Sequence, residues 1–349
     1  MKKIYIAGII SLTVNLFNSS SLFAQDARYT QSYANPLQLN PAIMGESSDM
    51  KFILNYRNQW SAINKGYTTY SFTGTYPVFL NKGKGKLDIG ISAMNDKAGA
   101  FSTLDLGLAV DYNKEIAPNN NLCFAIIGSY VQKSLDASNL TYDNQYILGS
   151  YNANNSSKEL TLTEKSSHPD LGFGFMWYLN PSREKSKLNA FLGISGFHLN
   201  QPNQTFIGAN GKLPMRFNYQ GGVKIFGENK IDITPNVRVS MQNGNVETAA
   251  GMYVDYNFSD NAKLVVGAWY RRQDAISFLL GFEHKSFTLG YSYDMINTNL
   301  NKVVPGIYAH EITLSYKLSR LSKSSTPSTG TSVSGKSLPS VRSSPFSSF

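Results

Sequence analysis

The sequence predicts an all-β fold, a transmembrane antiparallel β-barrel of about 14 strands, on three observations. Charged residues make up only 16% of the chain and aromatic residues 13%, whereas soluble domains carry roughly 25% charged residues. Apolar and polar residues alternate along most of the sequence. The connections between the alternating segments are sorted by length. The mean hydropathy is mildly negative, which excludes a bundle of membrane helices.

The chain begins with a segment typical of a cleaved signal peptide. Lys2 and Lys3 precede a mostly apolar run over residues 4–17, and Ala24 offers a small residue at the cleavage point before Gln25. The apolar run is too short and too interrupted to span a membrane as a helix. We therefore predict that residues 1–24 are removed and that the mature protein resides in the cell outer membrane.

Period-2 alternation places the strands. Within residues 104–113 the even positions are Leu, Val or Tyr, whereas the odd positions, which include Asp105 and Asp111, are small or polar. Segments of roughly 10–12 residues are long enough to cross the hydrocarbon layer when tilted. The expected strands are residues 51–60, 67–79, 86–95, 102–115, 120–133, 168–179, 188–198, 215–227, 230–241, 247–258, 261–272, 276–284, 286–295 and 307–318.

Loop length separates a membrane barrel from a soluble sandwich, because a sandwich has no reason to sort its connections. Connections after even-numbered strands are short, whereas those after odd-numbered strands include the longest, residues 134–167, 199–214 and 296–306. Short periplasmic turns and long extracellular loops are typical of outer-membrane barrels. This pattern places both mature termini in the periplasm, and it makes the loop 134–167 the expected partner-facing surface.

Two segments lie outside the predicted barrel of residues 51–318. Residues 25–50 contain Asn35-Pro36 and Asn40-Pro41, and a residue before proline is disfavoured in the α region. We expect this segment to be extended or turned rather than helical, and to lie in the lumen or under the periplasmic rim. Residues 319–349 are rich in Ser and Pro and carry basic but no acidic residues, which predicts a disordered basic periplasmic tail.

Charged side chains within strands would be costly if they faced lipid. We therefore expect them to point into the lumen or to lie at the rims, paired with opposite charges. They form either a salt-bridge network that packs the interior or the lining of a polar pore. The main candidates are Asp105, Asp111, Arg238, Asp255 and Arg271, together with Lys224, Asp232 and Glu283.

No pattern in the sequence indicates catalysis or metal binding. The chain has four histidines, but no nucleophile motif surrounds any serine and no convergent metal ligands are visible. We predict no enzyme activity and no cofactor. Cys123 has no partner for a disulfide. The net charge of +9 comes from scattered Lys and Arg residues, which argues against nucleic acid as a partner.

Several stretches resemble one family, the PorP/SprF membrane proteins of the Bacteroidota type IX secretion system. The N-terminal run 30–42, with Asn35-Pro36 and Asn40-Pro41, resembles its first signature. The next motif is Tyr56-Arg57-Asn58-Gln59-Trp60. Middle motifs lie at residues 168–172 and 193–202, and C-terminal ones at 270–274, at 289–294 with Asp294, and at His310-Glu311-Ile312. The matches run in order from about residue 26 to 318, so only the tail departs from the family pattern.

This resemblance implies a non-catalytic outer-membrane barrel that takes part in type IX protein secretion or gliding motility. It implies partners among the secretion and gliding components, or a cognate secreted adhesin retained at the cell surface, in addition to outer-membrane lipid. It implies no small-molecule substrate. The strand pattern taken alone leaves an alternative, an outer-membrane porin or hydrophobic-solute channel, which would need an open lumen.

Overall fold

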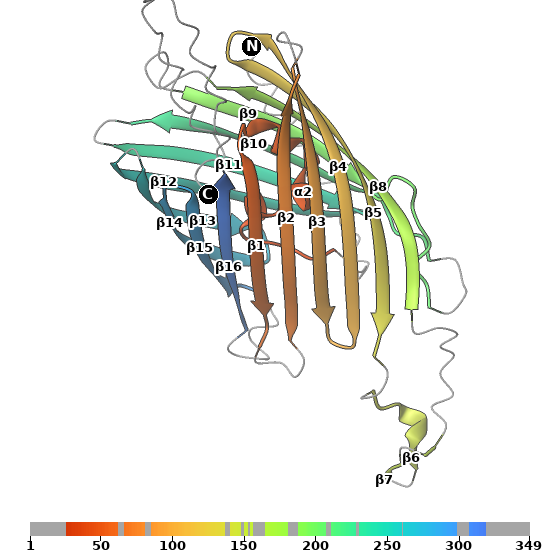
Figure 1. Ribbon diagram of the computed structural model, residues 1–349. Coiled ribbons are helices and arrows are strands. Elements are labelled where there is room, and N and C mark those ends of the chain that lie inside the picture. The colour runs from red at the N-terminus through yellow and green to blue at the C-terminus, as the bar shows by residue number, and fades with distance from the viewer. Residues whose placement is uncertain are drawn as a thin grey trace, which may run out of the picture.

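The computed structural model describes residues 26–318, with gaps at 62–65, 81–84, 137–139, 148–149, 153, 156–164, 181–187, 207–210, 228–229, 260 and 299–306. In this part of the chain, fourteen long antiparallel strands form a closed barrel, in which β1 pairs with β16 (Figure 1). The strands are β1 (Met50–Gln59), β2 (Tyr67–Phe79), β3 (Lys86–Ala98), β4 (Phe101–Ala117), β5 (Asn120–Leu135), β8 (Lys165–Leu179), β9 (Leu188–Phe197), β10 (Arg216–Phe226), β11 (Ile231–Gln242), β12 (Asn245–Ser259), β13 (Ala262–Arg271), β14 (Ala275–His284), β15 (Phe287–Ile296) and β16 (Tyr308–Leu318).

The predicted all-β barrel is confirmed, and its strand boundaries differ from the observed ones by no more than three residues. The alternation of residue type translates into alternation of burial. On β4, Leu106 and Leu108 are 44% and 59% exposed on the outer wall, whereas Ala109 and Asp111 are at most 1% exposed. One face of each strand is therefore suited to lipid and the other to a packed interior.

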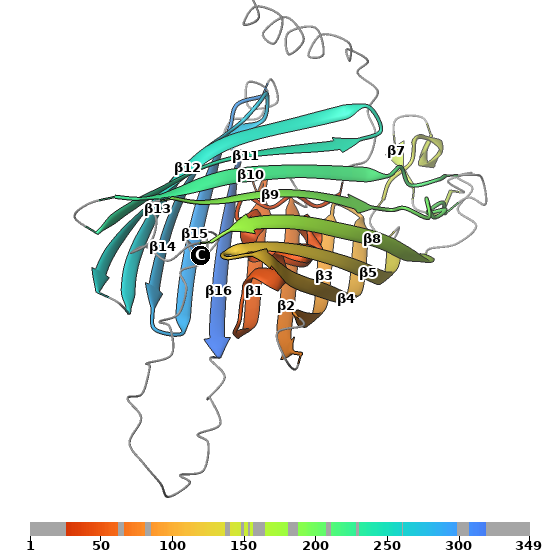
Figure 2. The same cartoon turned by 90° about the horizontal axis from the view of Figure 1, so that it is seen from above.

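The two ends of the barrel differ. The long-loop rim carries the ends of β1, β5, β9 and β15, and the short-turn rim carries the start of β1 and the end of β16. Within the connection between β5 and β8, η4 (Asp143–Gln145) and the two-residue strands β6 (Tyr146–Ile147) and β7 (Ser150–Tyr151) project beyond the long-loop rim (Figure 1). Strands on opposite walls cross at a steep angle (Figure 2), as barrel tilt requires.

Residues Asp26–Asp49, the lumen segment, lie inside the barrel. They contain η1 (Ser32–Ala34), α2 (Pro36–Leu39) and η2 (Pro41–Glu46), and η2 contacts β3, β4, β5 and β8. Leu37 and Ala42 of this segment are fully buried, and they belong to one apolar cluster with Ala109, Cys123 and Met176 of the barrel wall. The main core of this protein therefore lies between the lumen segment and one side of the barrel.

The prediction that this segment avoids helix is wrong. Asn35 and Asn40 do adopt non-helical backbone, at φ −126° and −162°, as residues before proline prefer. Each proline then occupies the first turn of a short helix, where its missing N–H costs nothing. The Asn40 side chain accepts a hydrogen bond from the Ala42 amide at 3.0 Å and so caps η2. None of the helices in the described residues is long and apolar enough to span a membrane.

The lumen segment also runs the length of the barrel. The Asp26 carboxylate contacts His198 and Arg216, which flank the connection between β9 and β10 at the long-loop rim. Met50 pairs with Leu318 at the short-turn rim. The described chain therefore starts and ends at opposite ends of the barrel. The expectation that both mature termini lie in the periplasm assumed that residues 26–49 stay near the start of β1, whereas Asp26 lies at the long-loop rim.

We predict that Gly174→Ala destabilises the barrel by about 1–3 kcal/mol through overpacking. A Cβ at this position of β8 would overlap Asn40 Oδ1 and lie 2.7 Å from the amide nitrogen of Ala42. Urea unfolding of the refolded barrel in liposomes measures the effect. Gly128→Ala is the matched control, because its Cβ would meet only Leu171 Cδ2 at 3.9 Å. Equal midpoints for the two variants would contradict this packing.

Candidate functional site

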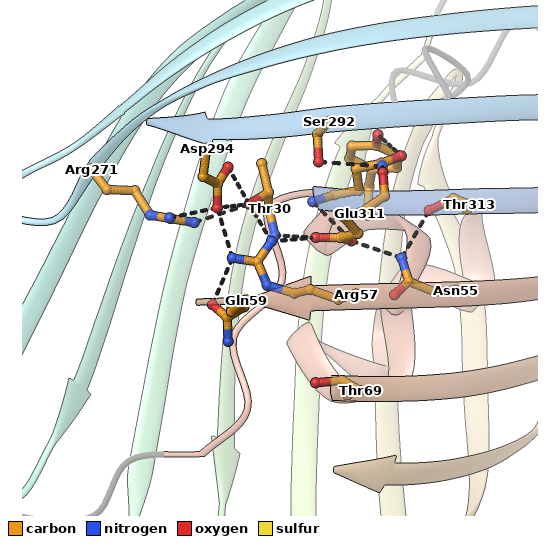
Figure 3. A network of polar contacts seen from close by, with 12 residues as sticks. Thr30, Asn55, Arg57, Gln59, Thr69, Arg271, Ser292, Asp294, Glu311 and Thr313 are labelled. Carbon is orange, nitrogen blue, oxygen red and sulfur yellow. Dashed lines mark hydrogen bonds and ion pairs between the residues drawn. The ribbon is translucent and has the colours of Figure 1, made fainter. Parts of the chain in front are cut away.

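A network of buried charges joins the lumen segment to the barrel wall near the β1–β16 closure (Figure 3). Arg57 on β1 and Glu311 on β16 are register partners, with Arg57 Nη1 2.8 Å from Glu311 Oε2. Arg57 Nη2 lies 2.7 Å from Asp294 Oδ2 on β15. Arg271 Nη2 on β13 lies 2.9 Å from the same oxygen. Four strands thus converge on what we term the Arg57 network: Thr30, Gln31, Asn55, Arg57, Arg271, Ser292, Asp294, Glu311 and Thr313.

Thr30 of the lumen segment occupies the centre of this network. Its amide donates to Glu311 Oε2 at 2.8 Å, and its hydroxyl donates to Asp294 Oδ2 at 2.7 Å. The same hydroxyl accepts from Arg57 Nη1 at 2.7 Å and from Arg271 Nη1 at 3.1 Å. Next to it, Gln31 Nε2 donates to the Glu311 carbonyl oxygen at 2.9 Å. The wall charges are therefore arranged around the lumen segment rather than only around one another.

The network is balanced and almost fully shielded from solvent. Two guanidinium groups face two carboxylates, and the side chains of Arg57, Asp294 and Glu311 are at most 1% exposed. A buried charge without its partner is strongly destabilising, because it loses its hydration with no compensating attraction. Asn55 Nδ2 adds a further hydrogen bond to the Glu311 carboxylate, donating to Oε1 at 2.7 Å, and it also donates to Thr313 Oγ1 at 2.8 Å.

A second anchor holds the middle of the lumen segment. Asn40 is fully buried, and its Nδ2 donates to the carbonyl oxygens of Phe175 on β8 and Ile194 on β9, both at 3.2 Å. The neighbouring Leu39 carbonyl accepts from Ser195 Oγ at 2.7 Å and from Asn218 Nδ2 at 3.0 Å. The second Asn-Pro pair of the sequence thus fastens the segment to three adjacent strands.

The start of the lumen segment is held by a charged cluster at the long-loop rim. His198, just after β9, places Nδ1 2.6 Å from Asp170 Oδ2 and Nε2 2.8 Å from Asp26 Oδ2. Arg216 Nη1 lies 2.6 Å from the same Asp26 oxygen. Burial opposes the imidazolium, but the charge of Asp26 and the hydrogen bond to Asp170 outweigh it and raise the pKa of His198 to about 9. Burial likewise opposes the Asp26 carboxylate, but Arg216 and His198 outweigh it and lower its pKa.

The structure divides the family-motif residues between the two faces of the strands. Arg57, Asp294 and Glu311 point inward into the Arg57 network, and Gln59 accepts from Arg57 Nη2 at 2.9 Å. Tyr56 and His310 are exposed on the outer wall, where the His310 Nδ1 and the Tyr291 hydroxyl lie 2.8 Å apart. Three further motif positions contact β2. Asn58 Nδ2 lies 3.5 Å from Thr68 Oγ1, and the Trp60 ring packs on Tyr67. Asn35 Oδ1 accepts a hydrogen bond from the Ser71 hydroxyl.

The candidate lumen charges all lie on the inner side of the strands. Asp105 accepts from Gln38 of the lumen segment at 3.2 Å, and Asp111 lies against Gly45 of that segment. Asp255 pairs with Lys224 at 2.7 Å. Arg271 belongs to the Arg57 network, and Arg238 lies 3.7 Å from Glu247. The three secondary candidates also have partners. Lys224 pairs with Asp255, and Asp232 accepts a hydrogen bond from Asn257 Nδ2 at 3.1 Å. Glu283 forms ion pairs with Lys263 and Lys317, both at 3.2 Å.

The sequence did not predict which residues contact the charged side chains of the barrel wall. Thr30, Gln31 and Asp26 lie in a segment that was not placed on the barrel wall, and Arg216 lies at the very start of a strand. Asp170 and His198 belong to two separate motifs, neither of which predicts the contact between them. One signal was available, since Arg57 and Glu311 face each other if the first and last strands pair in a closed barrel. Among the described residues, no group of three or more His, Cys, Asp or Glu side chains is arranged to hold a metal ion.

Comparison with known families gives one match. The sequence model described as "Type IX secretion system membrane protein PorP/SprF" matches residues 21–316. The chain belongs to the PorP/SprF family. This is a family of type IX secretion outer-membrane proteins and not a known family of enzymes. A comparison with curated proteins finds no match.

Solved structures similar to this PorP/SprF protein are outer-membrane barrels. The toluene transporter TbuX of Ralstonia pickettii has a TM-score of 0.51 at 9% identity, over 81% of this chain and 92% of that one. A FadL homologue of Pseudomonas aeruginosa has a TM-score of 0.48 at 11% identity, over 85% and 95% of the two chains. At such low identity the likeness to TbuX supports the fold alone.

We predict that Arg57→Ala destabilises this PorP/SprF barrel by about 3–5 kcal/mol, because it leaves Asp294 and Glu311 with uncompensated buried charge. Urea unfolding in liposomes measures the loss. Arg272→Ala, which removes an exposed arginine from the long-loop rim, should change stability by less than about 0.5 kcal/mol. If both variants unfold at the same urea concentration, the Arg57 network does not stabilise the barrel.

We predict a pH dependence for the His198 cluster. The pKa of His198 is raised in the folded state to about 9, from 6.5, so its stabilising contribution is complete below about pH 6.5 and is lost as the pH rises through 9. Thermal unfolding should therefore show His198→Gln to be most destabilising at pH 6 and much less so at pH 10. Asp26→Asn should abolish most of this difference, and a difference that stays constant from pH 6 to 10 would refute the assignment.

Proposed function

We propose that this protein is a closed outer-membrane scaffold of the type IX secretion or gliding apparatus, and that it holds a partner protein at its long-loop rim. The observation that carries this proposal is the lumen segment. Residues 26–49 occupy the interior and are fastened at three places, by the His198 cluster, the Asn40 anchor and the Arg57 network. A barrel whose interior is filled by its own chain is suited to binding rather than to conducting.

The charged interior supports the same conclusion. Several inward-facing charges are matched in pairs, as in Lys224 with Asp255 and Arg57 with Glu311. Glu311 also accepts from the backbone amide of Thr30 in the lumen segment. A conducting pore would instead leave a continuous polar lining in contact with water. Similarity to transport barrels such as TbuX extends to the fold, and the packing of the lumen segment favours the scaffold over the channel.

The long-loop rim is the proposed extracellular side, and the short-turn rim is the proposed periplasmic side, because long loops face outward in bacterial outer-membrane barrels. In this orientation Leu318 at the end of β16 lies at the periplasmic side. The predicted basic tail, residues 319–349, lies outside the described residues, and its periplasmic contact with secretion components is part of this proposal. On the outside, the β6–β7 arm exposes Tyr146, Ile147 and Tyr151, at 53%, 56% and 45%. Exposed aromatic and aliphatic side chains at the tip of an arm suit contact with another protein.

The test is purification from the outer membrane in mild detergent with a tag inserted between β15 and β16, followed by mass spectrometry. We expect a secreted surface protein or type IX secretion components to co-purify. Replacing Tyr146, Ile147 and Tyr151 by Ser should reduce recovery of the extracellular partner at least several-fold, whereas Tyr146→Phe with Tyr151→Phe should preserve it.

Planar-bilayer recordings complete the test. We expect the wild-type barrel to show no reproducible conductance, and a variant without residues 26–49 serves as the open control. Recovery of the barrel alone, together with steady wild-type conductance, would favour a porin or hydrophobic-solute channel.

A further inference from the structure

A cavity lies between the lumen segment and the wall formed by β10, β11 and β12. Its volume is about 80 Å³, and its lining includes Asp26, Arg28, Asn35, Arg216, Arg238 and Glu247. Arg216 begins β10, and Glu247 follows the β11–β12 turn, so the cavity lies at the long-loop end of the barrel. The β11–β12 connection contains only Asn243 and Gly244, both at positive φ. This part of the long-loop rim therefore has no long loop.

The cavity presents hydrogen-bond donors that the protein itself leaves unused. Asn35 is 1% exposed, and its Nδ2 has no hydrogen-bond partner among the described residues. The same holds for Arg216 Nε, although the other nitrogens of that guanidinium contact Asp26 and the Gln38 carbonyl oxygen. A buried donor without an acceptor costs free energy, so these two groups mark a place where an acceptor oxygen would stabilise the protein.

Arg238 is the least satisfied charge of the cavity. Its side chain is 13% exposed, and its one ion-pair partner in the described part of the chain is Glu247, at 3.7 Å. Glu247 is held more closely by Arg28 Nε, at 3.0 Å, and Arg28 also reaches Asp274 at 3.6 Å. The face of Trp269 lies 6.0 Å from the Arg238 guanidinium. The Arg238 guanidinium is therefore nearly desolvated, and its one ion-pair partner in the described part of the chain is too distant for a bidentate hydrogen-bonded pair.

The lining favours an anion of low charge. Three guanidinium groups and two carboxylates lie among the lining residues, and Arg28 is also paired with Asp274 outside the lining. A singly charged carboxylate suits such a nearly balanced lining, whereas a phosphate, at roughly −1.5 to −2 near neutral pH, would bring more negative charge than Arg238 alone can balance. Guanidinium groups and amide donors together also match the two oxygens of a carboxylate.

We propose that this cavity is a binding site for a carboxylate that enters from the long-loop side, with Arg238 as its main ion-pair partner and Asn35 and Arg216 as hydrogen-bond donors. The carboxylate belongs either to a small organic acid or to an acidic side chain of a protein. This site is separate from the Arg57 network and from the β6–β7 arm, so it stands or falls independently of the scaffold proposal.

The test is isothermal titration calorimetry on the detergent-solubilised full-length barrel at low salt, with two probes. One is propionate and the other is an end-capped hexapeptide with a single Glu among Gly residues, and propionamide and the corresponding Gln peptide are the uncharged controls. We expect saturable binding of a charged probe, weakened at least tenfold by Arg238→Gln and unchanged by Arg272→Gln. Glu247→Gln should strengthen binding several-fold, because it releases both Arg238 and Arg28 from their internal partner.

The outcomes separate the two sources of the carboxylate. Binding of both charged probes identifies a site for small acids, and binding of the peptide alone identifies a site for an acidic protein segment. Thermal unfolding of each variant shows whether the barrel is intact. Absence of saturable binding up to millimolar probe, or equal binding by the wild type, Arg238→Gln and Glu247→Gln, overturns the proposal.

Discussion

The interaction on which the rest of the structure depends is the pairing of Arg57 with Asp294 and Glu311 around Thr30. It joins the first strand, the last two strands and the lumen segment at one buried point. Neither carboxylate could be buried in an apolar interior without a cation. Closure of the barrel between β1 and β16 and seating of the lumen segment therefore use the same side chains, and the two events are energetically coupled.

Motif residues that are adjacent in the sequence lie in different environments. Adjacent residues of a strand face opposite sides of the sheet. Glu311 points inward and supplies one carboxylate of the Arg57 network. His310 beside it lies on the outer wall, in contact with the aromatic rings of Tyr291 and Tyr293. Such a group suits the membrane–water interface. A short motif of this family thus contributes to internal closure and to the outer surface at the same time.

The lumen segment runs from one rim of the barrel to the other and supplies much of its core. It starts at the long-loop rim, held by His198 and Arg216, and descends past the Arg57 network and the Asn40 anchor to β1 at the other rim. Apolar packing and the polar anchors alternate along its length, with Leu37 buried between the Arg57 network and the Asn40 anchor and Ala42 buried just after that anchor. The interior is therefore a protein core of mixed character, and the unused donors near Arg238 lie at its long-loop end.

The sequence by itself determined the barrel, its strand number and the strand boundaries to within three residues, because strand alternation and loop length are local properties of the chain. It also identified Asp105, Asp111, Arg238, Asp255 and Arg271 as lumen candidates, since the cost of facing lipid applies to each charge separately. Only the tertiary structure decided which charges meet. Thr30 and Glu311 are 281 residues apart, and no periodicity connects them. The helices of the lumen segment were likewise decided by packing, because Asn-Pro sequences are compatible with either a turn or a helix start, and the surrounding wall selects between the two.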